Sequence, residues 1–161
     1  MGRFIAFLYG IAAYLFFAVT FLYAVAFVSN VIVPTTIDTG KAAPPLLAAI
    51  IDLGLMAAFA IQHSVMARQG FKRWWTKIVP EPVERSTYVV ASSAALALLL
   101  WQWRPIPVVV WGVENRTFAM LILALALIGW LIVGLSTFLI IHFELFGLAQ
   151  VGRHLTRSAP E

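Results

Sequence analysis

Four long stretches almost free of charge constrain this chain more than any other feature. No Asp, Glu, Lys or Arg lies between Arg3 and Asp38, from Ser86 to Trp103, or from Thr117 to Phe143. A further stretch, Ala42 to Ala67, is interrupted only by Asp52. A helix of about 20 residues crosses the roughly 30 Å hydrocarbon core of a bilayer. Each stretch can therefore span a membrane.

The composition favours helices surrounded by lipid. Apolar residues make up 62% of the 161 positions, charged residues only 11%, and the mean hydropathy is +0.93. The stretches are apolar throughout instead of alternating, and a helix satisfies its own backbone groups in lipid. The prediction is an all-α polytopic membrane protein, a bundle of four transmembrane helices. These lie at roughly 4–28, 46–67, 87–103 and 118–143, in a single domain of residues 1–148 followed by a tail of residues 149–161.

The basic residues predict an orientation. With four spans, eight of the eleven Lys and Arg residues fall on the side of the N-terminus and three on the other side. Basic residues collect on the cytoplasmic side, so both termini and the tail are expected in the cytoplasm. The net charge of +4 then indicates topology and contact with anionic lipid, and nucleic acid is not expected as a partner.

Ionisable residues at the edges of apolar helices are costly and are the first candidates for function. Asp52 and His63 share one face of the second predicted helix, with Asp52 near its external end, where water is expected within reach. The cytoplasmic ends of three helices should bring a set of polar side chains to one depth: His63, Arg68, Arg85, Tyr88, His142 and Glu144.

The histidines also raise the question of a metal site or a haem site. The chain has no cysteine, and its three histidines form no recognised zinc spacing. A haem clamped between His63 and His142 remains an alternative in a four-helix bundle. A non-catalytic membrane subunit is the other alternative.

Several blocks resemble one family in the same order along nearly the whole chain. They are RFIAFLYG at 3–10, AIQHSVMAR at 60–68, ERSTY at 84–88, WQWRP at 101–105 and HFELFGL at 142–148. Together they resemble the bacterial methanethiol S-methyltransferases, which are similar to the isoprenylcysteine carboxyl methyltransferases and to NnrU-type membrane proteins. The resemblance implies a bacterial inner-membrane enzyme that transfers a methyl group from S-adenosylmethionine to a small thiol, such as methanethiol, giving dimethyl sulfide.

Placement within the predicted bundle suggests roles for four residues. His63 and His142 are the catalytic candidates, as contacts or bases near the thiol. Arg85 and Glu144 are the candidates for orienting the cofactor. No catalytic motif of the family maps onto these four residues.

The resemblance also implies a difference from the family. Its cofactor site is built mainly by a later segment with an Arg-His-Pro block, whereas here Leu155 follows Arg153 and His154. The chain is therefore expected to correspond to the N-terminal part of the enzyme. A separate C-terminal half, or self-association, would be needed to complete the site.

Overall fold

The computed structural model describes residues 2–106, 108–109, 112–139 and 147–156, and this part is helical with no strand. The elements are α1 (Arg3–Val28), α2 (Pro45–Ala67), α3 (Gln69–Trp75), the 3₁₀ turn η1 (Glu81–Val83), α4 (Glu84–Gln102), α5 (Arg116–Leu139) and α7 (Leu148–Thr156). Four helices are long and apolar enough to cross a membrane: Arg3–Val28, Pro45–Ala67, Glu81–Gln102 and Arg116–Ser136. The predicted fold class is confirmed. The predicted end of the fourth helix, at 143, lies outside the described residues.

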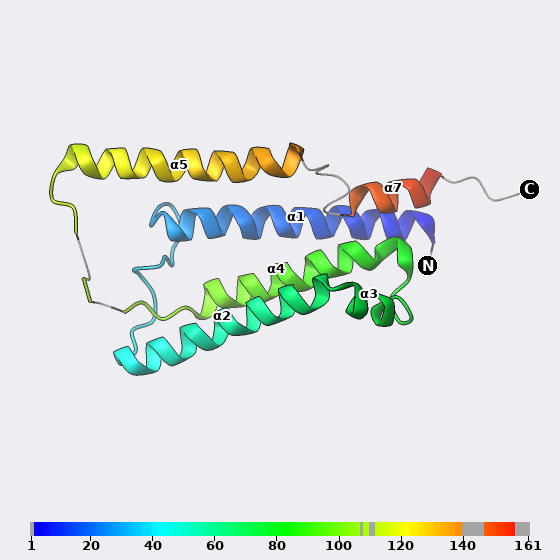
Figure 1. Ribbon diagram of the computed structural model, residues 1–161, viewed down its shortest axis with the longest axis horizontal. Coiled ribbons are helices and arrows are strands. Elements are labelled where there is room, and N and C mark those ends of the chain that lie inside the picture. The colour runs from blue at the N-terminus through cyan, green and yellow to red at the C-terminus, as the bar shows by residue number, and fades with distance from the viewer. Residues whose placement is uncertain (1, 107, 110–111, 140–146, 157–161) are drawn as a thin grey trace, which may run out of the picture.

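The long helices run roughly along one axis (Figure 1). Helix α1 packs against α4, α4 packs against α2, and the short α7 lies along the N-terminal half of α1. Helix α5 runs beside α1 on the side away from α2, where Trp130 meets Phe21 edge-on at a centroid distance of 5.9 Å. We refer to the end of the bundle that carries α3 and α7 as the α3–α7 end, and to the other as the loop end.

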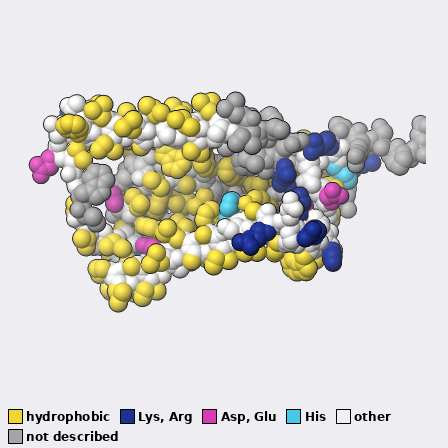
Figure 2. Space-filling model, in the orientation of Figure 1, with side chains coloured by type: hydrophobic (Ala, Val, Ile, Leu, Met, Phe, Trp, Pro, Cys, Tyr) yellow, Lys and Arg dark blue, Asp and Glu magenta, His cyan; other side chains and the backbone are white. Residues whose placement is uncertain are grey.

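The surface of the long helices is apolar. Large side chains such as Leu22, Leu53 and Leu125 are about two-thirds exposed, at 67, 65 and 67%. Figure 2 shows hydrophobic side chains along the length of the molecule, while Lys and Arg gather at the α3–α7 end. An apolar surface of this extent needs lipid to cover it. The chain is an integral membrane protein.

At the loop end, polar and aromatic contacts hold the residues that follow α4 against α1, α2 and the loop between them. Asp52 Oδ1 accepts a hydrogen bond from the backbone N–H of Arg104 at 2.9 Å. The indole N–H of Trp103 donates to the carbonyl of Ile37 at 3.0 Å, and its ring meets Phe27 edge-on. Asp52 is only 4% exposed, so the expectation that water reaches it was wrong. Its Oδ2 is buried with no hydrogen-bond partner in the described structure.

Helix α7 docks closely on α1. Val151 is fully buried and clusters with Ala6 and Val83. Gly10 makes this approach possible, because a Cβ at that position would lie 2.6 Å from Val151 Cγ2. The segment assigned from sequence to a tail thus includes a helix packed on the bundle.

Candidate functional site

Two of the polar residues expected to gather lie in direct contact. His63 is one turn before the end of α2, and Tyr88 is one turn after the start of α4. The Tyr88 hydroxyl lies 3.1 Å from His63 Nδ1 and 3.2 Å from Nε2, and the ring centroids are 5.5 Å apart. Which ring nitrogen bonds to the hydroxyl depends on the tautomer of the histidine. The pair holds the imidazole between two packed helices.

Further side chains surround this pair. Ser92 follows Tyr88 by one helical turn, and its hydroxyl lies 3.4 Å from both His63 Nδ1 and Gln62 Nε2. Phe59, one turn before His63, stacks on the imidazole at a centroid distance of 5.5 Å. Sequence reasoning missed Ser92, although a hydroxyl four residues after Tyr88 in an apolar run was a usable signal.

A small pocket opens beside the imidazole, between α1, α2 and α4. Its volume is about 120 Å³ and its walls are almost entirely apolar. An apolar cavity of about 150 Å³ can hold a benzene molecule. The pocket therefore fits a molecule of a few heavy atoms. The lining residues are Phe17, Phe59, His63, Tyr88, Val89, Ser92, Ser93 and Leu96.

Arg85 lies three residues before Tyr88, close to the segment that enters α7. A Cβ on Gly147 would lie 3.2 Å from Arg85 Cβ and 3.0 Å from the backbone nitrogen of Ser86. Gly147 also has a φ of +81°, a conformation that favours glycine. The chain therefore enters α7 pressed against the start of α4.

Only half of each proposed residue pair can be placed. His63 and Arg85 are described, whereas His142 and Glu144 lie outside the described residues. The haem alternative, which needs both histidines, lies outside them too. In the part of the chain that is described, no three His, Asp or Glu side chains lie close enough together to hold a metal ion.

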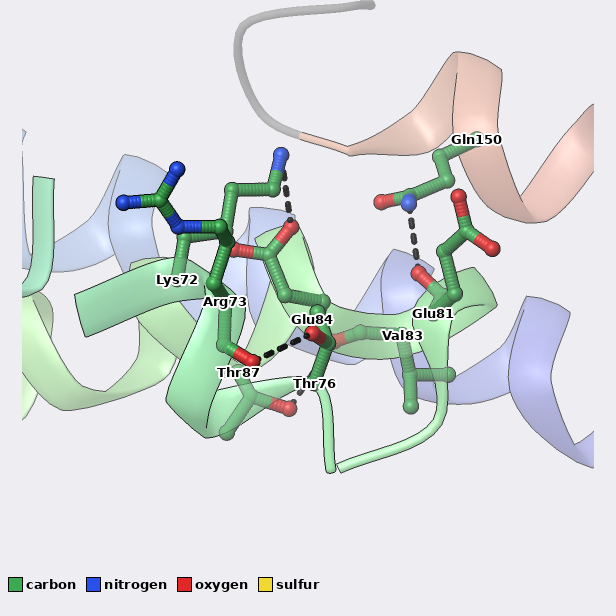
Figure 3. Close-up of polar contacts among 8 residues, drawn as sticks. All are labelled: Lys72, Arg73, Thr76, Glu81, Val83, Glu84, Thr87 and Gln150. Atoms are coloured by element: carbon green, nitrogen blue, oxygen red, sulfur yellow. Dashed lines mark hydrogen bonds and ion pairs between the residues drawn. The ribbon is translucent and has the colours of Figure 1, made fainter. Parts of the chain in front are cut away.

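Polar side chains also line a pocket at the α3–α7 end, where η1 meets α7. Gln150 of α7 donates a hydrogen bond to the carbonyl of Glu81 (Figure 3). The pocket has a volume of about 240 Å³ and is lined by Glu81, Pro82, Gln150, Arg153 and His154. Sites for drug-sized ligands usually measure about 300–1,000 Å³. This pocket is therefore smaller than the usual site for a ligand as large as S-adenosylmethionine.

Comparison with known proteins finds relatives named methanethiol S-methyltransferase and Nurim. It is 59% identical over 153 residues to methanethiol S-methyltransferase 1 of Bradyrhizobium diazoefficiens, covering 95% of this chain and 54% of that protein. It is 54% identical to the methanethiol S-methyltransferase of Mycobacterium tuberculosis, covering 94% of this chain and 62% of that protein. Nurim of Bos taurus is 34% identical over 110 residues, 65% of this chain and 42% of that protein.

Two other comparisons found nothing: no family model and no solved structure matches the chain. The chain spans only about half to three-fifths of the length of the two methyltransferases. The identity nevertheless extends over almost all of this chain, including the helices that build the His63 pocket. Over almost its whole length the chain is therefore similar to proteins named methanethiol S-methyltransferase.

Proposed function

We propose that this protein supplies the thiol-binding part of a membrane-embedded, S-adenosylmethionine-dependent thiol S-methyltransferase. The observation that carries the proposal is the pocket beside His63, which combines a small apolar volume with one imidazole. A small alkyl thiol such as methanethiol has that size and polarity, and it partitions into lipid without a carrier. The names of the relatives point to the same substrate class.

The residues of the pocket suit the activation of a thiol. The thiolate is the nucleophilic form, and an alkyl thiol in neutral water is mostly protonated. In the proposed reaction an imidazole nitrogen of His63 takes the S–H proton, while Tyr88 and Ser92 hold the ring in place. The apolar walls exclude water, which would otherwise solvate the thiolate.

The methyl donor is assigned to two residues, of which one is described. S-adenosylmethionine would supply a methyl group on a sulfonium, and Arg85, with Glu144 outside the described residues, remains the proposed pair that orients it. Of this pair only Arg85 is described, so the described residues carry mainly the thiol half of the proposed reaction.

Methyl transfer by two separately expressed parts tests this proposal. The chain alone should form no dimethyl sulfide from methanethiol and S-adenosylmethionine. Co-expression with the part of the Bradyrhizobium enzyme that this chain does not match should give dimethyl sulfide in the headspace. That second part expressed alone is the control. Failure of the combined parts, with both present in the membrane, would contradict the proposal.

We also propose that the protein lies in the bacterial inner membrane with the α3–α7 end in the cytoplasm, on the basis of the eight-to-three distribution of basic residues. Reporter fusions after Glu161 and within the loop of residues 76–80 should read cytoplasmic. Fusions near Lys41 or Glu114 should read external. An external signal at Glu161 would contradict the four-span orientation.

A further inference from the structure

We propose that residues 68–77, which we call the α3 shelf, form a binding site for the headgroup of an anionic phospholipid. The proposal is independent of the methyltransferase function. It rests on the depth of the shelf in the membrane, on its unpaired cations, on its aromatic cluster and on a pocket bordered by its side chains.

The geometry of α2 sets the depth. Its 23 residues measure about 34 Å at 1.5 Å per residue, a little more than the hydrocarbon core. The chain then turns at Arg68, whose backbone is extended (φ −74°, ψ 138°), and α3 leaves the axis of α2. The shelf therefore begins where the hydrocarbon ends, at the level of the lipid headgroups.

The shelf carries four cations within ten residues, and one of them has an ion-pair partner among the described residues. Lys72 forms an ion pair with the buried Glu84, at 3.2 Å from Nζ to Oε2 (Figure 3). Arg73 lies beside Lys72 with its guanidinium turned away from Glu84. Arg68, Arg73 and Lys77 make no ion pair with any described residue. Three positive charges of the shelf thus have no ion-pair partner among the described residues.

Three aromatic rings of α3 form one cluster. The centroid of Phe71 lies 5.4 Å from that of Trp74 and 5.7 Å from that of Trp75, and the two indoles are 6.0 Å apart. Trp74 is 52% exposed. Tryptophan at this depth prefers the boundary between headgroups and acyl chains. The cluster therefore holds the shelf, with its cations, at the interface.

A pocket of about 680 Å³ lies between α3 and η1. It is lined by Gln69, Lys72, Arg73, Thr76 and Glu81. Four of these side chains can donate hydrogen bonds to phosphate oxygens, and a guanidinium can do so with two N–H groups at once. Glu81 is the one acceptor-only group among the five. The excess of hydrogen-bond donors in the pocket, with Arg68 and Lys77 on the same shelf, fits a lipid phosphodiester without a compensating cation, as in phosphatidylglycerol, better than the zwitterionic phosphatidylcholine.

The test compares two double variants of the purified chain by native mass spectrometry, in an equimolar mixture of phosphatidylglycerol and phosphatidylcholine. The wild type should retain phosphatidylglycerol preferentially. Arg73→Gln with Lys77→Gln should lower that preference up to about 25-fold, since each cation near an anionic surface contributes about fivefold. Lys41→Gln with Arg116→Gln removes the same charge at the loop end and should leave the preference nearly unchanged.

Three outcomes would overturn the proposal. The first is a wild type without preference, and the second is an equal loss in both double variants, which would show attraction by net charge alone. The third is displacement of phosphatidylglycerol by millimolar inorganic phosphate, which would show a site for a free anion. Thermal melting curves of both variants, measured in the same detergent, separate loss of the site from loss of the fold.

Discussion

Replacing His63 by alanine is expected to lower kcat/KM for thiol methylation about a hundredfold or more, in the chain completed by the remaining part of a relative. The reason is the loss of the only described base in the thiol pocket, and general-base catalysis typically contributes about 10²–10⁴-fold. Raising the pH should restore part of the lost rate in His63→Ala, because solvent then supplies more thiolate without help from the protein. Rates should be measured from dimethyl sulfide formation across a pH series.

His154→Ala is the matched control, since His154 is a described histidine on α7 outside the thiol pocket. This variant should keep most of its activity. The amount of folded protein in the membrane must be measured for both variants. If His63→Ala loses protein and activity in equal proportion, the imidazole only holds α2 against α4, and its proposed role as a base would be wrong.

Replacing Asp52 by alanine is expected to destabilise the protein by about 1–3 kcal/mol. The change leaves the backbone N–H of the half-buried Arg104 without its acceptor, and a donor that loses its partner away from water costs up to about that much. For a chain of this size the midpoint of thermal unfolding should fall by roughly 2–4 °C per kcal/mol. Melting curves of the wild type and the variant, purified in the same detergent, would measure this fall in the midpoint.

Asp52→Asn separates the hydrogen bond from the charge. The amide oxygen can still accept from Arg104, while the second carboxylate oxygen, which has no partner in the described structure, becomes an amide nitrogen. This variant should therefore melt close to the wild type or above it. If it loses as much stability as Asp52→Ala, the negative charge itself stabilises the fold, and a cationic partner for Asp52 must be sought.

The membrane spans could be predicted because each depends on a local property, the absence of charge over about 20 residues. The third span shows the limit of that approach. Its helix α4 begins at Glu84 instead of near 87, and Glu84 is buried although it carries a charge. The ion pair with Lys72 explains how Glu84 can be buried at the start of the helix. Averaging hydropathy along the sequence does not reveal a contact between residues twelve positions apart.

Helix α7 escaped prediction for a related reason. It has nine residues, so it is too short to span a membrane, and its polar side chains lower its mean hydropathy. Its apolar residues are buried by α1 and η1, which lie far away in the sequence. At the candidate site, the depths of His63 and Tyr88 followed from their places in two antiparallel spans. The contribution of Ser92 depends on the relative rotation of the two helices, which the sequence does not specify.

The contact between Gly10 and Val151 joins positions about 140 residues apart. A ribosome adding about 5–20 residues per second takes on the order of ten seconds to make the chain between them. During that interval α7 does not yet cover the surface of α1 at Gly10, while the later spans enter the bilayer. Helix α7 can therefore cover this surface of α1 only after the spans between them have been made, so factors that meet α1 early in synthesis contact a surface that the folded chain buries.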